Sequence, residues 1–201
     1  MRRKRKEKKK SLLNKQNIVG LIIVVIMISS VLGFMINENS GNQSTDYNDH
    51  EFTQQNGYWY TSYNSNSIRL RFHPDALDSI FLSYESSAAI RDSMMTYLTF
   101  DPDDKNIEYI EQVRLELEQE MPKLFNTYIM TGVTNTDGSY GALPMISCSN
   151  ATASVPVIYL ASSDEDSFSY NSNCLIVSAT TGNNILMMKD RLVLGLADII
   201  S

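Results

Sequence analysis

The sequence predicts an α+β fold: an N-terminal transmembrane helix, a polar tether, and one extracytoplasmic domain with a mostly antiparallel sheet packed by about three helices. Three observations lead to this prediction. Residues 18–36 contain no charge. Apolar and polar residues alternate over 68–72, which is typical of a half-buried strand. Apolar residues recur at helical spacing over 107–121 and 185–199.

Residues 18–36 are long and apolar enough for an uncleaved membrane anchor. A helix rises about 1.5 Å per residue and the hydrocarbon core is about 30 Å thick, so about twenty apolar residues are needed. A cleaved signal peptide is the alternative, although its apolar core usually has about 7–15 residues and no Ala-x-Ala site follows here. We therefore divide the chain into a basic head (1–17), a transmembrane helix (18–36), a polar tether (37–56) and a domain (57–201).

Charge is distributed unevenly along the chain. Nine of the 17 basic residues but only one of the 23 acidic residues lie in 1–17, so the head carries +8 and the rest of the chain −14. Basic residues beside an anchor favour a cytoplasmic N-terminus. We therefore expect a single-pass protein of the cell membrane whose C-terminal domain is extracytoplasmic. A domain this acidic should not bind nucleic acid or anionic lipid.

Cys148 and Cys174 are the only cysteines. Outside the cytoplasm such a pair more often forms a disulfide than a metal site, although buried free thiols and reactive thiols are alternatives. Two cysteines cannot complete a zinc tetrahedron, and no histidine is near either in the sequence. Glycosylation sequons at Asn42 and Asn150 would lie on the same outer side.

The first half of the domain begins with β-type sequence. Segments 58–63 and 68–72 flank the turn cluster Asn64-Ser65-Asn66-Ser67 and predict a hairpin. Its tyrosines and tryptophan indicate a packed strand or, alternatively, a platform for stacking sugar or peptide. Helical spacing then predicts helices over 88–98 and 107–121, and Pro122 should end or kink the second.

The second half predicts strands and a last helix. Asp137-Gly138 is a strong hairpin signal between strands over 124–134 and 140–149. Further strands are predicted over 155–161, at 168–170 and over 174–179. Because Pro156 donates no hydrogen bond, the strand over 155–161 should start late or run along an edge.

The last helix, to about residue 199, is apolar around most of its circumference. Such a helix is either wedged between layers or docks on something else. Its candidate interface residues outside the main apolar stripe are Leu186, Met187, Val193 and Leu194. The pair Asp190-Arg191 forms either an exposed polar strip, an internal salt bridge to Asp92 or Glu85, or an interface contact.

The order of several motifs resembles a known group of proteins. After the hydrophobic run come Arg-Phe-His-Pro at 71–74, an acidic amphipathic helix, Pro-Met-Ile-Ser-Cys-Ser-Asn-Ala-Thr at 144–152, Asn-Cys-Leu-Ile-Val at 173–177 and Asp-Arg-Leu-Val-Leu-Gly at 190–195. This order resembles a family of uncharacterised archaeal single-pass membrane-anchored proteins, which share a cysteine-bracketed strand segment and a C-terminal Asp-Arg-Leu helix. The resemblance covers most of 56–196 and carries no activity. It implies an archaeal envelope protein and favours pairing of Cys148 with Cys174.

The usual catalytic and cofactor motifs do not occur in the sequence. There is no Gly-x-Ser-x-Gly, no phosphate-binding glycine loop and no His-Glu-x-x-His. The histidines are His50 in the predicted tether and His73 before a proline, so a Ser-His-Asp site would have to use His73. Asp101-x-Asp103 begins like a calcium loop but lacks the turn glycine and final glutamate. We therefore predict no catalytic residue, no metal site and no cofactor.

These features favour a non-enzymatic role. We predict a membrane-tethered extracytoplasmic interaction module or accessory subunit of an envelope complex, with a protein partner in addition to the membrane. One alternative is an extracytoplasmic hydrolase of cell-surface polymers that uses a carboxylate pair, which only the fold would bring together. The other is a ligand-binding receptor domain, which needs an apolar pocket with a few polar anchors.

Overall fold

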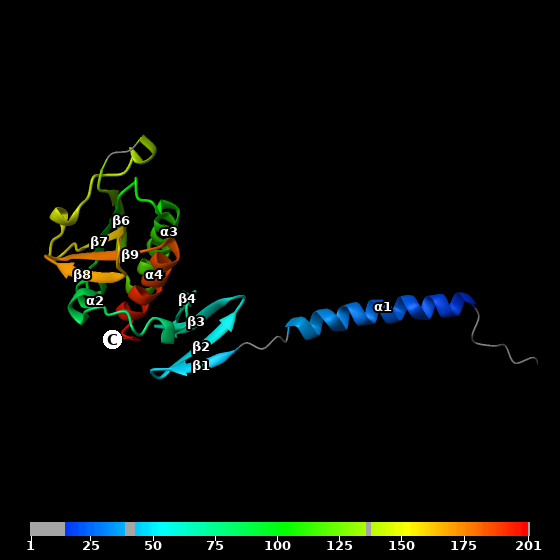
Figure 1. The fold of residues 1–201 in the computed structure, drawn as a ribbon. Helices are drawn as coiled ribbons and strands as arrows, with labels where there is room; N and C mark the ends of the chain where they lie inside the picture. Colours follow the sequence, from blue (N-terminus) through cyan, green and yellow to red (C-terminus); the bar gives the residue numbers. More distant parts are fainter. Residues whose placement is uncertain (1–14, 39–42, 136–137, 201) are drawn as a thin grey trace, which may run out of the picture. The chain divides into compact units, whose positions relative to one another are not determined.

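Two compact units make up this computed structural model. It describes the backbone of residues 15–38, 43–135 and 138–200, and the side chains of these residues except 15–17, 31–38 and 138. The first unit is Met1–Asn42 and the second is Gln43–Ser201 (Figure 1). The predicted α+β class is confirmed for the second unit, which contains every strand of the described chain.

The first unit contains one described helix, α1 (Lys15–Glu38). Every side chain described in it, from residue 18 to residue 30, is exposed. Ser30 Oγ donates a hydrogen bond to the carbonyl oxygen of Ile26 at 2.9 Å, so the helix itself satisfies this hydroxyl. Within the described part of the chain, no helix combines the length and the apolar character that a membrane crossing requires. Residues 1–14 of the predicted head lie outside the described residues.

A small antiparallel sheet opens the second unit. Its strands pair in chain order: β1 (Ser44–Tyr47), β2 (His50–Gln55), β3 (Tyr58–Tyr63) and β4 (Asn66–Leu70). Each connection is a two-residue turn with positive φ at both central residues, which matches the right-handed twist of the flanking strands. The predicted hairpin over 58–72 is therefore confirmed.

The predicted tether over 37–56 is wrong for its second half. Residues 44–55 form β1 and β2, and Phe52 in β2 is fully buried. An antiparallel sheet can pack one face on the core and leave the other in water, so many of its positions can be polar. The polar composition of this segment therefore concealed two strands, and the domain begins at Gln43 rather than at residue 57.

A mixed sheet with the strand order β6-β5-β7-β9-β8 forms the centre of the domain. Its strands are β5 (Met95–Phe100), β6 (Tyr128–Val133), β7 (Val157–Ser162), β8 (Ser167–Asn171) and β9 (Cys174–Ala179). Neighbouring strands are parallel except at β8, which runs antiparallel at one edge. The prediction of one mostly antiparallel sheet is wrong, because short apolar runs do not reveal the direction of pairing. Pro156 precedes β7, which starts late as predicted but is the central strand.

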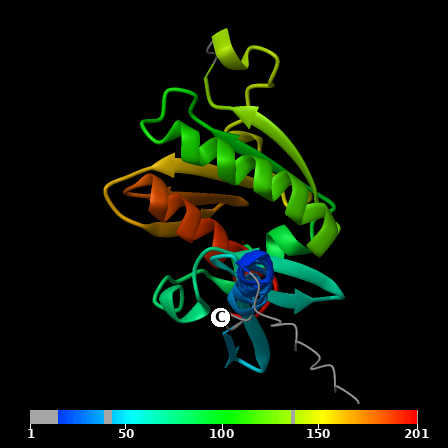
Figure 2. The same ribbon diagram turned by 90° about the vertical axis from the view of Figure 1, so that its right-hand side faces the viewer.

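Three helices complete the domain: α2 (Tyr84–Arg91), α3 (Ile107–Phe125) and α4 (Gly182–Leu196). Figure 2 shows α3 and α4 lying across the same face of the mixed sheet. The amphipathic pattern over 107–121 predicted α3 correctly, and the helix continues through Pro122 to a left-handed cap at Asn126. The last helix ends at Leu196, slightly earlier than predicted.

Two local predictions fail. The helix predicted over 88–98 stops at Arg91, where Ser93 Oγ donates to the Ile90 carbonyl at 2.7 Å and competes with continuation of the helix. The strand predicted over 140–149 is absent: short 3₁₀ turns at Gly138–Tyr140 and Cys148–Asn150 replace it. Asp137 of the predicted hairpin turn lies outside the described residues.

Candidate interaction surface

The two long helices of the domain, α3 and α4, lie on one face of the mixed sheet. Thr131 of β6 bonds to Glu118 of α3, which identifies the helix-covered face. Neighbouring residues along a strand point to opposite faces, so Met130 and its pairing partner Tyr97 lie on the other face. A segment without regular helix covers part of that other face, and we call it the strap (residues 144–156). Parallel sheets are normally covered on both faces, so this arrangement leaves strand surface accessible.

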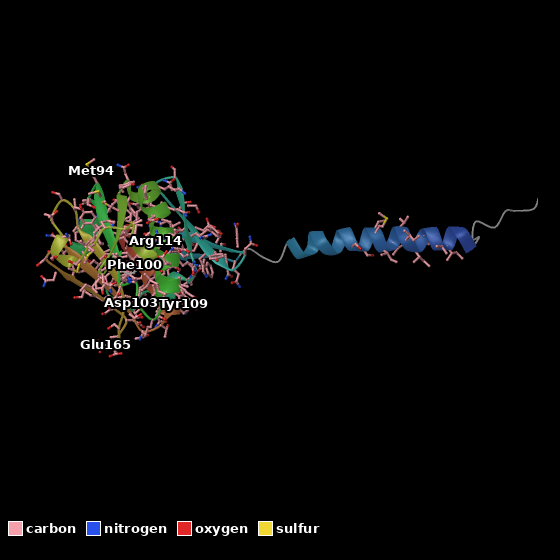
Figure 3. All side chains as sticks on the ribbon, turned by 90° about the horizontal axis from the view of Figure 1, so that it is seen from above. Met94, Phe100, Asp103, Tyr109, Arg114 and Glu165 are labelled. Carbon is pink, nitrogen blue, oxygen red and sulfur yellow. A yellow bond between two sulfur atoms is a disulfide. The ribbon has the colours of Figure 1, made fainter. Side chains whose placement is uncertain are left out.

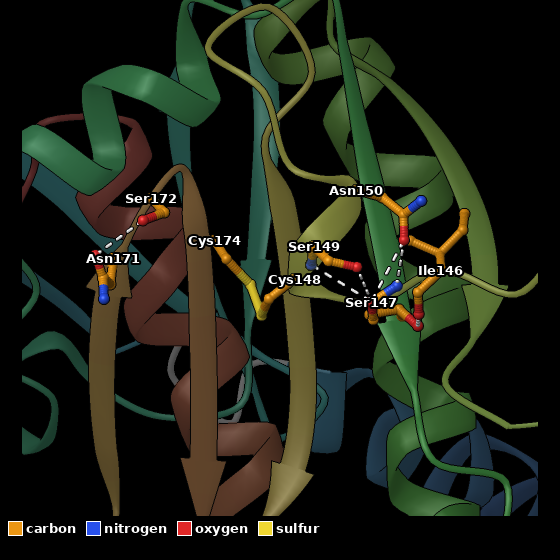
Figure 4. The surroundings of a disulfide bond; sticks show 9 residues. Ile146, Ser147, Cys148, Ser149, Asn150, Asn171, Ser172 and Cys174 are labelled. Atoms are coloured by element: carbon orange, nitrogen blue, oxygen red, sulfur yellow. Dashed lines mark hydrogen bonds between the residues drawn. A yellow bond between two sulfur atoms is a disulfide. The ribbon is translucent and has the colours of Figure 1, made fainter.

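A disulfide fastens the strap to the sheet. Cys148 of the strap is bonded to Cys174 at the start of β9, with an S–S distance of 2.03 Å and a Cα–Cα distance of 5.3 Å (Figure 4). Thr99 Oγ1 donates to the Ile146 carbonyl at 2.7 Å. Ile146 packs directly on Gly132, where a Cβ atom would lie 2.6 Å from its side chain. The predicted disulfide is therefore confirmed, and its structural effect is to hold the strap across the sheet.

Beyond the strap, the face of β6 that points away from α3 is not covered by any described segment. Tyr128 is 64% exposed and Met130 is 41% exposed, and both project from the face opposite α3. Met94, directly before β5, is 82% exposed, and its backbone carbonyl accepts from the Tyr128 amide at 2.9 Å, so the two backbones are neighbours where β5 and β6 begin. Figure 3 shows Met94 projecting from the surface of the domain. We call the side chains of Met94, Tyr128 and Met130 the β6 surface.

The backbone of β6 has a free edge beside this surface. Its neighbour in the described sheet is β5 alone. At its end, Val133 donates to the Pro144 carbonyl at 3.0 Å and accepts from the Ile146 amide at 2.8 Å, so the strap occupies the outer edge there. Alternation then directs the backbone groups of Ile129 and Thr131 to the same outer edge. The sequence did not predict this surface. Residues 128–133 contain no charge and no proline, a composition that indicates an unprotected edge strand.

The two predicted glycosylation sites are Asn42 and Asn150, and the structure describes the second. Asn42 lies outside the described residues. Asn150 is exposed, and its Oδ1 accepts a hydrogen bond from the Ser147 amide at 2.9 Å (Figure 4). Glycosylation at both positions stays a prediction.

The predicted interface on the last helix is wrong. Leu186, Val193 and Leu194 are buried inside the domain, and Met187 is half-buried against the same core. The helix α4 is enclosed by α3, β9 and α2. Its apolar circumference therefore results from a position between layers, which was the alternative that the sequence left open.

Lys189 is a buried charge at the centre of α4. Its Nζ lies 3.3 Å from Glu116 Oε2, 3.2 Å from Glu120 Oε2 and 3.1 Å from Asp190 Oδ1. Burial alone would lower the pKa of Lys189, but these carboxylates raise it above its ordinary value. Burial raises the pKa of Glu116, yet Arg71 and Lys189 outweigh it and lower that pKa from 4.5 to about 2. Burial raises the pKa values of Glu120 and Asp190. The cluster thus joins α3 to α4 through Lys189.

Asp190 joins the same network to the small sheet. Its Oδ2 accepts hydrogen bonds from the backbone amides of Arg71 at 2.5 Å and Phe72 at 3.1 Å, directly after β4. The Arg71 guanidinium forms a two-point ion pair with Glu116 of α3. Asp190 is fully buried, so the exposed strip is not formed, and Asp92 pairs with Arg91 rather than with Arg191.

Arg191 is fully buried as well. Its Nε donates to the Ile80 carbonyl at 2.7 Å and its Nη1 to the Ile200 carbonyl at 3.2 Å, which fastens two irregular segments to α4. Burial lowers the pKa of Arg191. Among the described residues, none accepts a hydrogen bond from its Nη2. Gly195 leaves room for this guanidinium, because a Cβ there would lie 2.9 Å from Nη1.

Polar side chains gather where β5, β6 and β7 end. Asp101 accepts from Asn135 Nδ2 at 2.8 Å, and Asp104 accepts from the Ser162 and Asn106 amides, each at 2.8 Å. The ends of β5 and β7 flank a topological switch point, where α/β sheets often bind ligands. Here protein donors occupy both acids, and no group of three or more potential metal ligands occurs among the described residues. These bonds hold three strand ends together.

Three hollows mark other parts of the domain surface. Two of them, of about 360 and 380 Å³, flank the exposed side chain of Phe81. The smaller is mainly apolar and includes Leu82, Tyr84 and Ile200. The third, of about 530 Å³, is polar and lies over β2 and β3, with Asp49, His50 and Glu51 in its lining. His73 contributes to none of these hollows; its Nδ1 accepts from the Asp75 amide at 3.3 Å and its ring packs against Trp59.

Comparison with known proteins identifies no relative. No family model matches the chain, and no curated protein or solved structure is significantly similar to it. The resemblance to an archaeal membrane-anchored family over 56–196 therefore stays a prediction.

Proposed function

We propose that this chain is a membrane-tethered extracytoplasmic interaction module, an accessory subunit of an envelope complex that contacts its partner through the β6 surface. The observation that carries the proposal is the exposure of Met94, Tyr128 and Met130 beside an open strand edge. Scattered apolar side chains are ordinary on protein surfaces, but a contiguous group is typical of an interface. Tyrosine and methionine are also enriched in interfaces relative to other surfaces.

The membrane tether is supported by sequence and by exposure. The uncharged run over 18–36 extends beyond the side chains that the structure describes, so its full length is known from the sequence. Its described part, residues 18–30, exposes apolar side chains around the whole helix. Such a surface is unfavourable in water and favourable in hydrocarbon. The +8 head and −14 remainder favour an N-terminus in the cytoplasm and a domain outside it.

Protease accessibility tests the topology. We expect protease added outside intact cells to remove the domain from Gln43 onward and to leave an epitope tag placed before residue 15 protected. Tags on a cytoplasmic protein and on an outer-surface protein serve as controls. Protection of the domain in intact cells would contradict the proposed orientation.

The interaction role is tested with the full chain, extracted in a gentle detergent. We expect a native mass above that of the monomer and a lower mass for the Met130→Lys variant, because a charge cannot be desolvated in an apolar contact without a partner. Phe81→Lys is the matched control, since Phe81 is also an exposed apolar residue but lies before α2. A strictly monomeric chain, with Met130→Lys identical to the unmodified protein, would argue against the proposal.

A carboxylate-based hydrolase remains the second candidate, for one specific reason. The polar hollow over β2 and β3 contains two acids, Asp49 and Glu51, with His50 between them. A single substitution, Glu51→Gln, should then abolish any polysaccharide cleavage by the purified chain while leaving its native mass unchanged.

A receptor would instead use the mainly apolar hollow beside Phe81, whose volume of about 360 Å³ is at the lower end of the ~300–1,000 Å³ that ligand pockets occupy.

A further inference from the structure

We propose that the occupant of the β6 surface is a second copy of this chain. The two β6 strands would pair antiparallel across a two-fold axis and join two mixed sheets into one. This inference rests on the proposed function and names the partner at the same surface. It follows from the backbone, the charge and the side chains of β6.

The backbone of β6 is suited to strand addition. An edge strand presents unpaired amide and carbonyl groups, and natural edge strands are usually protected by charged residues, proline or a bulge. Between Tyr128 and Val133 there is no charge and no proline, and the strand pairs with β5 in unbroken register. The strap already pairs with the far end of this edge, at Val133. The edge from Ile129 to Thr131 is open to a further strand.

Charge favours a second copy over a different partner. The sequence outside the head carries −14, so two copies repel each other over most of their surfaces. Residues 124–135 include no acid and no base, which makes the β6 edge a place where two copies can meet without opposing charges. Glu118, a carboxylate that contacts β6, is paired with Arg114 and bonded to Thr131. A basic partner would gain nothing from this uncharged edge and would bind an acidic surface instead.

The outward groups of β6 define the register. Ile129 and Thr131 both direct backbone groups outward, so an antiparallel pair that uses both places Ile129 opposite Thr131 of the second copy. Met130 then lies opposite its own counterpart at the axis, in a pair without direct backbone bonds, where Cα atoms are about 4.5 Å apart. The paired segment ends before Val133, so it leaves the strap in place. Met130 and Tyr128 of both copies then project from the same face of the joined sheet, with the two Met130 side chains adjacent.

The contact is small, and the membrane compensates for this. Stable protein interfaces usually bury about 1,200–2,000 Å², which a three-residue strand pair with a few apolar side chains does not reach. Anchoring both copies in one membrane raises their effective concentration without any new contact. We therefore expect pairing in the membrane and in the concentrated detergent extract, and dissociation only on further dilution.

Cysteine crosslinking of the full chain in its membrane tests the pairing. Cα atoms about 4.5 Å apart are within the range that a disulfide bridges. We expect Met130→Cys to form a covalent dimer on mild oxidation, at least tenfold more than Ser169→Cys, an exposed position on the opposite edge strand β8. Two differently tagged copies, expressed together, should both be present in the crosslinked band. Intact Cys148–Cys174 pairing in each variant verifies folding.

The outcomes separate this inference from the proposed function. If Met130→Cys crosslinks no more than Ser169→Cys, the second copy is excluded. If Met130→Lys nevertheless lowers the native mass of the extracted complex, the β6 surface binds a different protein and the interaction role stands. If Met130→Lys has no effect on native mass either, the inference and the proposed function both fail.

Discussion

Replacing Lys189 with methionine tests whether the buried charge network stabilises the domain. Lys189 Nζ lies 3.1–3.3 Å from three carboxylates and is 1% exposed. At an effective dielectric constant of about 20, each such contact contributes about 5 kcal/mol of attraction, which offsets the cost of burying the charges. Removing one member of a buried ion pair typically costs about 3–5 kcal/mol, because its partner charges remain buried. We expect Lys189→Met to lower the free energy of unfolding by that amount at pH 7.

The pH dependence of this loss distinguishes a charge effect from a packing effect. Burial raises the pKa values of Glu120 and Asp190 above their ordinary values, and Lys189 opposes this rise, so its removal raises both pKa values further. A group whose pKa is raised by folding binds more protons in the folded state, so the variant gains stability as pH falls. The difference between Lys189→Met and the unmodified protein should therefore be smaller at pH 5 than at pH 7.

Urea unfolding of residues 43–201 measures this difference. Trp59 is the only tryptophan, and it packs against His73 next to the network, so its fluorescence reports unfolding of the small sheet. Circular dichroism reports the helices independently. Lys123→Met, an exposed position on α3, is the matched control and should change stability by less than about 0.5 kcal/mol. A cost for Lys189→Met below about 1 kcal/mol at pH 7, or one that does not change at pH 5, would refute the reasoning.

Three further predictions concern the strap and acid stability. Gly132→Val places side-chain atoms where Ile146 packs, and should destabilise the domain by about 1–3 kcal/mol or release the strap to proteolysis; unchanged unfolding and proteolysis would contradict this packing. Replacing Cys148 and Cys174 with serine opens a loop whose ends are 26 residues apart in sequence and should cost about 3–4 kcal/mol, measured by urea unfolding with and without reductant. Folding lowers the pKa of Glu116 from 4.5 to about 2, so its contribution of about 3 kcal/mol is complete above pH 4.5 and disappears as pH falls towards 2. An acid titration of Glu116→Gln should lack this part of the transition, and an unchanged profile would show that Glu116 is not responsible.

Hydrophobic periodicity predicted the elements that have one strong pattern. The inner stripe of Ile110, Val113, Leu117 and Met121 is buried in α3, as its spacing indicated. The apolar run over 174–179 is β9, and the short segment at 168–170 is part of β8. The two cysteines also predicted their own pairing, because their compartment and number left few alternatives.

Long-range pairing could not be predicted from the same patterns. β5 pairs with β6 on one side and β7 on the other, and both partners follow long connections that a local pattern does not describe. The prediction of an interface on α4 was wrong for a related reason. Apolar residues around a whole helix indicate burial, but not whether the covering layer belongs to the same chain or to another. Only the positions of α3, β9 and α2 decide this.

The sequence described the buried charges of α4 least well. For Asp190 and Arg191 the sequence left an exposed strip, an internal salt bridge and an interface contact open, and it did not single out Lys189, since charged residues are rarely fully buried without partners. Their partners come from segments far away in the sequence: Arg71 after β4, Glu116 and Glu120 on α3, and the carbonyls of Ile80 and Ile200. The β6 surface was missed in the same way, because the exposure of Tyr128 and Met130 depends on where the strap crosses the sheet.

The order of the small sheet determines how the domain responds to mechanical tension from its N-terminal side. Force applied at Gln43 acts first on β1, an edge strand that pairs antiparallel with β2 and can separate from it one residue pair at a time. Side-chain contacts resist this separation from the start, because Tyr47 bonds to Asp78, Asn48 bonds to the Ile199 carbonyl, and Phe52 is buried in the core. After β4, Arg71 adds its backbone bond to Asp190 and its ion pair with Glu116. Tension on β1 is therefore passed to α3, α4 and the C-terminal segment, so the small sheet and the rest of the domain resist it together.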